Sequence, residues 1–470
     1  MRLSTCTLLF ILYVTLAVFQ NIASILAVRF LGNDSIISSL ALTGKDFILI
    51  LICVTAGIAF CSDLLNGKIA VRKLAAVITL VSTCAFVTVT TLQTSVEYLQ
   101  DARLLLILPL STLLGILLAW RLNISLIMRF MMSISIFVAI SSWIEYALYL
   151  IWDEQFWITM DLENYYQFRD EDRSSSMHGG YGGVPGRFYS WDVIALGFQD
   201  PIRRLVSFVF VDPTILGHFL SFAYAIALFQ RRYILAFFFF LTCAAGIAKG
   251  GLLVCLFATL FWAIGISIQS GNYFRISMIS TAAVIAIGVA AYFGIGSQSM
   301  KNHVSGLLGP VSRISTAVLG QGVGTGGNRA FYREKQRGRD LEGNDAYDRA
   351  EFASESYVGS MIQQIGILGI VAYLCAFWIN VPRQVVVPET LGLRVAALAT
   401  ILSSLASESA MSYSSTFAWL VLAAFAAAID TSAFYSGRMF GELHINQIPE
   451  FPALRAVPPS PLQDEPIYGR

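Results

Sequence analysis

Long apolar stretches separated by short polar connections recur along most of this 470-residue chain. A helix of about twenty apolar residues crosses the hydrocarbon core of a bilayer, which is about 30 Å thick. We place such stretches near residues 6–28, 46–61, 74–93, 103–120, 130–151, 213–230, 233–248, 250–268, 276–294, 356–380, 391–408 and 413–434. The seventh and eighth stretches can also be counted as one. The pattern predicts an all-α polytopic membrane protein with about twelve transmembrane helices.

Two long polar segments interrupt this pattern, and a proline-rich segment ends it. The boundaries predict five helices in 1–151, a first large loop in 152–212, helices six to nine in 213–294, a second large loop in 295–355, helices ten to twelve in 356–434 and a tail in 435–470. The tail has few large apolar residues, so we expect a disordered cytoplasmic segment.

The distribution of Lys and Arg predicts the orientation, because these residues stay preferentially on the cytoplasmic side in short connections. With the amino terminus inside, the inner connections hold Lys68, Arg72, Lys73, Arg121, Arg129, Arg231, Arg232, Arg275, Arg383 and Arg438. The short outer connections hold only Arg29, Lys45, Arg103 and Lys249. We therefore expect both ends inside and both large loops on the outer face.

Composition and charge agree with a membrane protein. Hydrophobic residues make up 56% of the chain, charged residues 13%, and the mean hydropathy is +0.68. The net charge of +1 leaves no basic stripe for a nucleic acid. The seven cysteines all lie in or beside apolar stretches, without the spacing of metal ligands, so we expect no disulfides, no metal and no cofactor.

The second large loop carries a glycine-rich run that follows Arg313. Gly320, Gly322, Gly324, Gly326 and Gly327 lie within eight residues. The Gly-x-Gly-x-x-Gly match in this run requires a strand before it and a helix after it in a βαβ unit, which the pattern does not predict, so we reject a dinucleotide site. Glycines here can bring main-chain N–H groups close to an anion. The alternative is a flexible turn.

A further motif follows at the start of the tenth apolar stretch. Glu355-Ser356, nine residues and Gly366-x-x-Gly369 resemble the His-(Asn/Ser)-x9-Gly-x-x-Gly signature of the O-antigen ligase and polymerase superfamily, with Glu355 in place of the histidine. Arg313-x10-Gly324 looks like the Arg-x10-Gly element of that family's second outer loop.

Two earlier elements are similar to the same family in the same order. Asp212-Pro213 resembles its Asn/Asp-Pro entry into a span, and Ala248-Lys249-Gly250-Gly251 stands where its Ser-Arg-Gly turn would be. The resemblance implies a metal-independent glycosyltransferase of the bacterial inner membrane, with its active site facing the periplasm. The implied substrate is an undecaprenyl-diphosphate-linked oligosaccharide, and the implied partners are a chain-length regulator, a flippase and the lipid bilayer.

The resemblance leaves the acceptor open. Wzy-type polymerases move a growing O-antigen or exopolysaccharide chain onto the next lipid-linked repeat unit, whereas ligases move a finished glycan to a lipid. Glu355 stands where the ligases have histidine, which favours a polysaccharide polymerase. The alternatives are ligase-type transfer to a lipid or other acceptor, and a transporter or flippase of lipid-linked oligosaccharides.

The chemistry of such a transfer suggests roles for particular residues. Cations stabilise the charge that develops on a diphosphate leaving group, and Arg313, Lys249 and then Arg204 are our choices for it. Glu355 is the candidate for accepting the proton of the attacking hydroxyl, and His303 is a second acid–base candidate. Simpler interpretations remain open for each: Lys249 reaches water, and Glu355 stabilises the positive end of a helix.

The first large loop offers further candidates for substrate binding. Arg203 and Arg204 either bind substrate or reach lipid headgroups. Asp212 either contacts substrate or caps the following helix. Aromatic residues such as Trp157 and Tyr165 either stack on sugars or anchor the chain at the membrane surface.

Overall fold

A computed structural model of the chain describes most of it. The described residues are 4–65, 71–92, 98–119, 121–153, 155–168, 188–189, 202–269, 278, 298–336, 351–353, 355–381 and 388–435. The ninth apolar stretch (276–294) apart from residue 278, most of the first loop, the charged part of the second loop and nearly all of the tail lie outside them. The chain clusters into two units, Met1–Asp430 and Thr431–Arg470, and the contacts below belong to the first.

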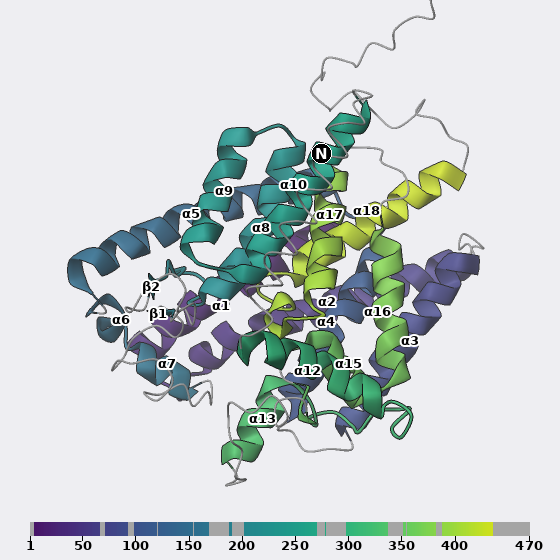
Figure 1. Ribbon diagram of the computed structural model, residues 1–470, viewed down its shortest axis with the longest axis horizontal. Coiled ribbons are helices and arrows are strands. Elements are labelled where there is room, and N and C mark those ends of the chain that lie inside the picture. Colours follow the sequence, from purple (N-terminus) through teal and green to yellow (C-terminus); the bar gives the residue numbers. More distant parts are fainter. Residues whose placement is uncertain are drawn as a thin grey trace, which may run out of the picture. The chain divides into compact units, whose positions relative to one another are not determined.

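Helices make up nearly all of the described structure (Figure 1). Among the described helices, six are long and apolar enough to cross a membrane. These are α1 (Thr5–Leu31), α2 (Ile36–Leu65), α3 (Val71–Leu92), α4 (Leu99–Leu117), α5 (Ile124–Trp152) and α10 (Lys249–Gln269). The helical part of the prediction is thereby confirmed, and these six helices are compatible with a membrane protein.

Shorter apolar helices lie at five of the other predicted positions, and the ninth position falls outside the described residues. They are α8 (Pro213–Phe229), α9 (Tyr233–Ala245), α16 (Ile367–Asn380), α17 (Pro388–Ser403) and α18 (Phe417–Tyr435). The seventh and eighth stretches are two separate helices, α9 and α10. Helix α8 is apolar and buried around almost its whole circumference, packing against α9, α10 and α17.

The tenth apolar stretch is divided, so the single helix predicted over 356–380 was wrong. Helix α15 covers Tyr357–Ile365, and α16 begins at Ile367. Gly366 separates them with a φ of +58°. A Cβ at this position would collide with the carbonyl oxygen of Val318. Gly366 therefore provides both the backbone turn and the space that the preceding polar loop needs.

The polar loops contain short elements that the apolar pattern did not predict. The second loop forms α12 (Gln298–Arg313) and α13 (Gly327–Gln336). Helix α12 buries one face at Asn302, Gly306 and Pro310, four residues apart. The first loop forms α6 (Gln155–Thr159), α7 (Leu162–Phe168) and an antiparallel pair of strands, β1 (Phe188–Tyr189) and β2 (Ile202–Arg203). A 3-10 turn, η3 (Glu408–Ala410), lies between α17 and α18.

Candidate functional site

Glu355 directly precedes the capping residue of α15, and main-chain contacts hold it there. Its φ is +69°, in the left-handed region that residues other than glycine rarely adopt. Its carbonyl oxygen accepts the N–H of Glu408 at 3.0 Å. The hydroxyl of Ser356 accepts the N–H of Gly359 at 2.9 Å and donates to the carbonyl of Leu405 at 2.7 Å. A strained backbone conformation persists only where the surrounding structure holds it. The contacts around Glu355 therefore fix its position at the start of α15.

The carboxylate of Glu355 meets an imidazole from α12. Nδ1 of His303 lies 3.2 Å from Oε2 of Glu355. The two side chains are 30% and 24% exposed, so the pair is accessible to solvent or substrate. The structure thus brings together two residues that the sequence suggested as separate acid–base candidates.

A close crossing of α12 and α15 produces this pairing. A Cβ on Gly359 would collide with the carbonyl oxygen of Gly306. His303 and Gly306 are three residues apart and therefore lie on the same side of α12. Because the two backbones touch at the glycines, the imidazole reaches the start of α15.

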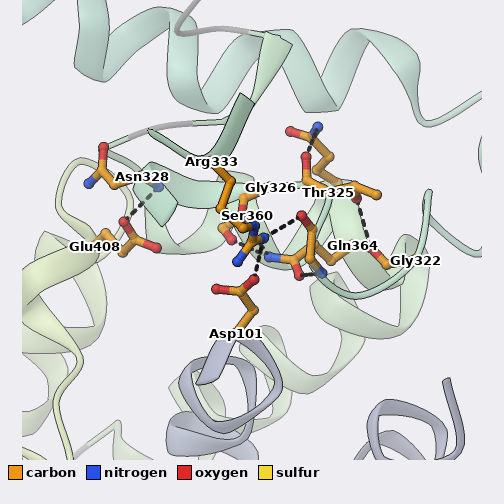
Figure 2. Close-up of polar contacts among 11 residues, drawn as sticks. Asp101, Gly322, Thr325, Gly326, Asn328, Arg333, Ser360, Gln364 and Glu408 are labelled. Atoms are coloured by element: carbon orange, nitrogen blue, oxygen red, sulfur yellow. Dashed lines mark hydrogen bonds and ion pairs between the residues drawn. The ribbon is translucent and has the colours of Figure 1, made fainter. Parts of the chain in front are cut away.

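The glycine-rich loop, defined here as residues 320–327, rests on the end of α15. Oε1 of Gln364 accepts the N–H of Gly324 at 2.7 Å. Nε2 of Gln364 donates to the carbonyl of Gly326 at 3.2 Å and to the hydroxyl of Ser360 at 2.7 Å (Figure 2). The carbonyl of Gln364 accepts the N–H of Gly322 at 3.1 Å. One glutamine therefore holds three positions of this loop.

The neighbouring glutamine ties the same loop to the end of the charged segment. Nε2 of Gln363 lies 2.8 Å from the carbonyl of Thr325 and 2.7 Å from the carbonyl of Glu351, and donates to these acceptors. The carbonyl of Gln363 accepts the N–H of Gln321 at 2.7 Å. Both glutamines are nearly completely buried, so these hydrogen bonds are shielded from water.

This arrangement changes the interpretation of Gly322 and Gly324. Both adopt positive φ, +100° and +89°, and a Cβ on Gly324 would collide with the ring of Tyr98. Their N–H groups are donated to Gln364, so they are not presented to an anion in this conformation. Glycine is needed here for backbone shape and close packing.

An ion pair joins α13 to the start of α4. Nη2 of Arg333 lies 2.6 Å from Oδ2 of Asp101 (Figure 2). It also donates to the carbonyl of Gly324 at 2.8 Å. The guanidinium carbon lies 4.8 Å from the ring centroid of Tyr98. Asp101 is 3% exposed and Arg333 21%, so water screens this pair only weakly.

A second carboxylate meets the opposite end of α13. Oε2 of Glu408 accepts the N–H of Asn328 at 3.0 Å (Figure 2). Burial raises the pKa of Glu408 to about 7; the N–H of Asn328 and the charge of Arg329 lower this pKa, and Asp101 raises it. The N–H of Glu408 donates to the carbonyl of Glu355 at 3.0 Å, so Glu408 connects α13 to the site of Glu355.

The two cations favoured from the sequence lie on different helices. Arg313 is the last residue of α12, and its guanidinium donates to the carbonyls of Gly309 and Glu351, each at 3.3 Å. Lys249 is the first residue of α10 and is exposed. Helix α12 packs against α15, whereas α10 packs against α8 and α17.

Arg203 and Arg204 both contact other parts of the protein, and these contacts give each residue a structural role. Arg204 is buried, and it donates to the carbonyls of Gly246 at 2.7 Å and Ile247 at 3.2 Å. These carbonyls follow α9, so Arg204 satisfies groups that a helix end leaves without a partner. The guanidinium carbon of Arg203 lies 5.7 Å from the ring centroid of Tyr149, a cation–π contact.

Asp212 is a helix cap, as one of its two interpretations predicted. Its Oδ1 accepts the N–H of Thr214 at 2.7 Å and of Ile215 at 3.2 Å, with Pro213 at the first helical position. This is the arrangement expected for an Asp-Pro helix start.

Two aromatic residues of the first loop are buried. Nε1 of Trp157 donates to Glu145 at 2.7 Å, and the hydroxyl of Tyr165 bonds to Oδ1 of Asn21 at 3.0 Å. Both side chains are 1% exposed. In this conformation both rings pack inside the protein, which favours a structural role over either interpretation made from the sequence.

Sequence reasoning missed five residues of this cluster: Asp101, Arg333, Gln363, Gln364 and Glu408. The adjacent glutamines were a visible sign, because two amides inside an apolar stretch need buried partners. Asp101 and Arg333 are 232 residues apart, so only the fold brings them together. Glu408 is the last residue of the eleventh apolar stretch, 391–408, and the structure places it in η3, beyond the end of α17.

No cluster of metal-ligating side chains occurs among the described residues. A comparison of the chain with known protein families and with characterised proteins found no match. The likeness to the O-antigen ligase and polymerase superfamily therefore rests on the four sequence elements alone.

Proposed function

We propose that this protein is a membrane polysaccharide polymerase. It transfers a glycan from a polyprenyl-diphosphate carrier onto the next lipid-linked repeat unit at the outer face of the bacterial inner membrane. In this proposal the chain has about twelve spans, and both large loops face outward. The observation that carries the proposal is the pair of Glu355 and His303, 3.2 Å apart and partly exposed.

An acid–base pair suits this reaction because the acceptor must lose a proton as it attacks. The hydroxyl oxygen of the acceptor sugar forms a bond to the anomeric carbon of the donor. The bond from that carbon to the diphosphate oxygen breaks, and its electrons leave with the polyprenyl diphosphate. The hydroxyl proton passes to the Glu355–His303 pair.

The leaving diphosphate develops negative charge, which cations stabilise more in the transition state than in the ground state. We assign this role to Arg313 and Lys249. Arg313 belongs to the same helix as His303, and its fork of N–H donors matches phosphate oxygens. We assign no role in substrate binding to Arg203, Arg204 and Asp212, because their contacts within the protein give each of them a structural role.

The substitution at the family motif favours polymerase over ligase. The ligase signature has a histidine where this chain has Glu355. Helix α12 supplies an imidazole beside that position instead. The site thus keeps acid–base chemistry while departing from the ligase pattern.

The proposal is tested with purified protein in liposomes that contain radiolabelled lipid-linked repeat units. We expect wild type to produce a ladder of longer lipid-linked glycans. Glu355→Gln should lower the rate of elongation at least about 100-fold, and Arg313→Ala should also lower it. Asp34→Asn, an exposed acid on the same predicted face, is the matched control and should elongate normally.

Other outcomes would contradict the proposal in different ways. Normal chain growth by the Glu355→Gln, Arg313→Ala double variant would refute the mechanism. Transfer to a lipid core acceptor, without a ladder, would indicate a ligase. Movement of the lipid-linked unit across the bilayer without any new glycosidic bond would indicate a flippase.

A further inference from the structure

We propose that the buried imidazole of His218 and the first turn of α10 together bind a phosphate group, and that this group belongs to the diphosphate of the polyprenyl carrier. The identity of the carrier rests on the proposed function. The new element is the set of protein groups, besides Lys249, that hold the leaving diphosphate.

His218 lies inside the protein in the second turn of α8. Its side chain is 0% exposed, and neither ring nitrogen has a hydrogen-bond partner among the described residues. A neutral imidazole carries one N–H donor and one lone pair. Burial of these groups without hydrogen bonds is costly, so a histidine in this state on an otherwise apolar helix is typical of a residue that binds a ligand.

The first turn of α10 presents main-chain donors beside this histidine. The N–H of Leu252 makes the first bond of the helix, to the carbonyl of Ala248 at 2.8 Å. The N–H groups of Gly250 and Gly251 come before that bond, and in the described part of the chain neither has an acceptor. Ala248, at the capping position, has no side-chain oxygen to offer them. The start of a helix with such N–H groups binds anions.

The ring of His218 lies on the side to which these N–H groups point. A Cβ on Gly250 would come within 2.5 Å of both Cε1 and Nε2 of His218. Because Cα–Cβ bonds in a helix tilt toward its amino end, Nε2 lies toward the amino end of α10. The first N–H groups of a helix point in the same direction. A phosphate at this end therefore accepts hydrogen bonds from the main chain and, when Nε2 carries the proton, from the imidazole.

The charges around the turn suit an anion. Lys249 is the first residue of α10 and is exposed. The guanidinium of Arg204 donates to the two carbonyls that precede the turn, so a second positive charge lies nearby. The carboxylate of Asp212, at the start of α8, accepts two N–H groups of its own helix. Positive charge and main-chain donors together favour a phosphate over a neutral ligand.

The site adjoins the elements that carry the proposed acid–base pair. Helix α8 packs against η3, and the N–H of Glu408 in η3 donates to the carbonyl of Glu355. As the bond between the anomeric carbon and the diphosphate oxygen breaks, its electrons remain on that oxygen. The N–H groups of α10 and of His218 stabilise this charge. His218 keeps its proton throughout the step.

Binding of farnesyl diphosphate, a short analogue of the carrier, tests the site without turnover. By titration calorimetry of the purified full-length protein in detergent, we expect His218→Leu to bind it at least about tenfold more weakly than wild type. His218→Gln places an amide N–H near the position of Nε2 and should stay within about threefold of wild type. Tyr224→Phe is the matched control, because it removes a hydrogen bond from α8 to Thr259 of α10, deeper in the bundle.

Thermal unfolding separates a role in binding from a role in packing. His218→Leu replaces a buried polar group without a partner by an apolar group, so it should unfold at the same temperature as wild type or higher. Weaker binding by such a stable variant means that a ligand contact has been lost. A lower melting temperature for both His218→Leu and His218→Gln, with equal loss of binding, would show that His218 acts in packing and would overturn the inference.

Nitrogen NMR of the histidine rings identifies the source of the phosphate. The chain has four histidines, so the signal missing from His218→Gln belongs to His218. We expect this signal to shift with farnesyl diphosphate and to stay unchanged with farnesol. An equal shift with phosphatidylglycerol micelles would assign the site to a phospholipid headgroup and overturn its assignment to the carrier. No shift with any of these probes would refute the phosphate site.

Failure of this inference and failure of the proposed function give different results. Wild-type protein that binds farnesyl diphosphate but forms no glycosidic product keeps the phosphate site and refutes the polymerase. Wild-type protein that extends glycans, with His218→Leu binding and extending equally well, refutes the role of His218 alone.

Discussion

At the scale of single residues, Glu408 has a strongly altered environment in the connection between α17 and α18. It is partly buried, and its carboxylate binds the first turn of α13 through Asn328. Burial raises its pKa from an ordinary value of 4.5 to about 7. The folded protein therefore holds a proton at Glu408 in a pH range where the unfolded chain has released it.

This difference makes stability depend on pH. Between pH 4.5 and 7 the folded state binds more protons at Glu408, so the free energy of unfolding falls as pH rises and levels off above 7. The upper limit is about 3 kcal/mol, reduced by the partial exposure of the side chain. Relative to Glu408→Gln, we expect wild type to lose thermal stability from pH 5 to pH 8 in detergent.

The control for this measurement is Asp34→Asn, whose melting temperature should follow that of wild type at every pH. A constant difference between wild type and Glu408→Gln from pH 5 to 8 would mean that Glu408 does not titrate in this range.

At the scale of elements, the crossing of α12 and α15 determines the geometry of the proposed site. The two helices touch where Gly359 meets the carbonyl of Gly306. A methyl group at this contact must push α12 away and with it the imidazole of His303. Stability and activity are therefore coupled at a residue that takes no part in the chemistry.

We expect Gly359→Ala to lower the free energy of unfolding by about 1–3 kcal/mol and to reduce chain elongation. The matched control is Gly57→Ala in α2, where a Cβ meets nothing within 4 Å. There alanine should leave stability unchanged or raise it by up to about 1 kcal/mol. Equal thermal unfolding of the two variants would show that the crossing is not tightly packed.

The helices could be predicted far better than the site. Apolar stretches reveal membrane-type helices through local sequence alone, and α8 also carries its own start in Asp212 and Pro213. The break at Gly366 was less predictable, because glycine is common in membrane helices. The polar contacts depend on residues such as Asp101 and Arg333, 232 positions apart, so no local pattern contains them.

At the scale of the whole molecule, the proposed function depends on the side of the membrane that holds the Glu355–His303 pair. The distribution of Lys and Arg predicts the outer side. Helices α12 and α13 then lie outside, and the turn between α8 and α9 lies inside.

We expect single cysteines at two exposed positions to label from opposite sides. In a variant without the seven native cysteines, Thr316→Cys should react with a membrane-impermeant maleimide added to intact cells. Arg232→Cys, beside the start of α9, should react only after the membrane is opened. Labelling of Thr316→Cys only from the cytoplasmic side would refute the topology.

The division of the tenth stretch at Gly366 has a consequence for the surrounding lipid. Helix α16 has 14 residues and is about 21 Å long, whereas a hydrocarbon core is about 30 Å thick. In the proposed topology, the remaining depth is taken by α15, whose glutamines bind the glycine-rich loop. The end of α15 and the glycine-rich loop bound to it then lie at the depth of the bilayer in this topology, which brings the residues of the proposed site closer to the diphosphate group of a membrane-bound carrier.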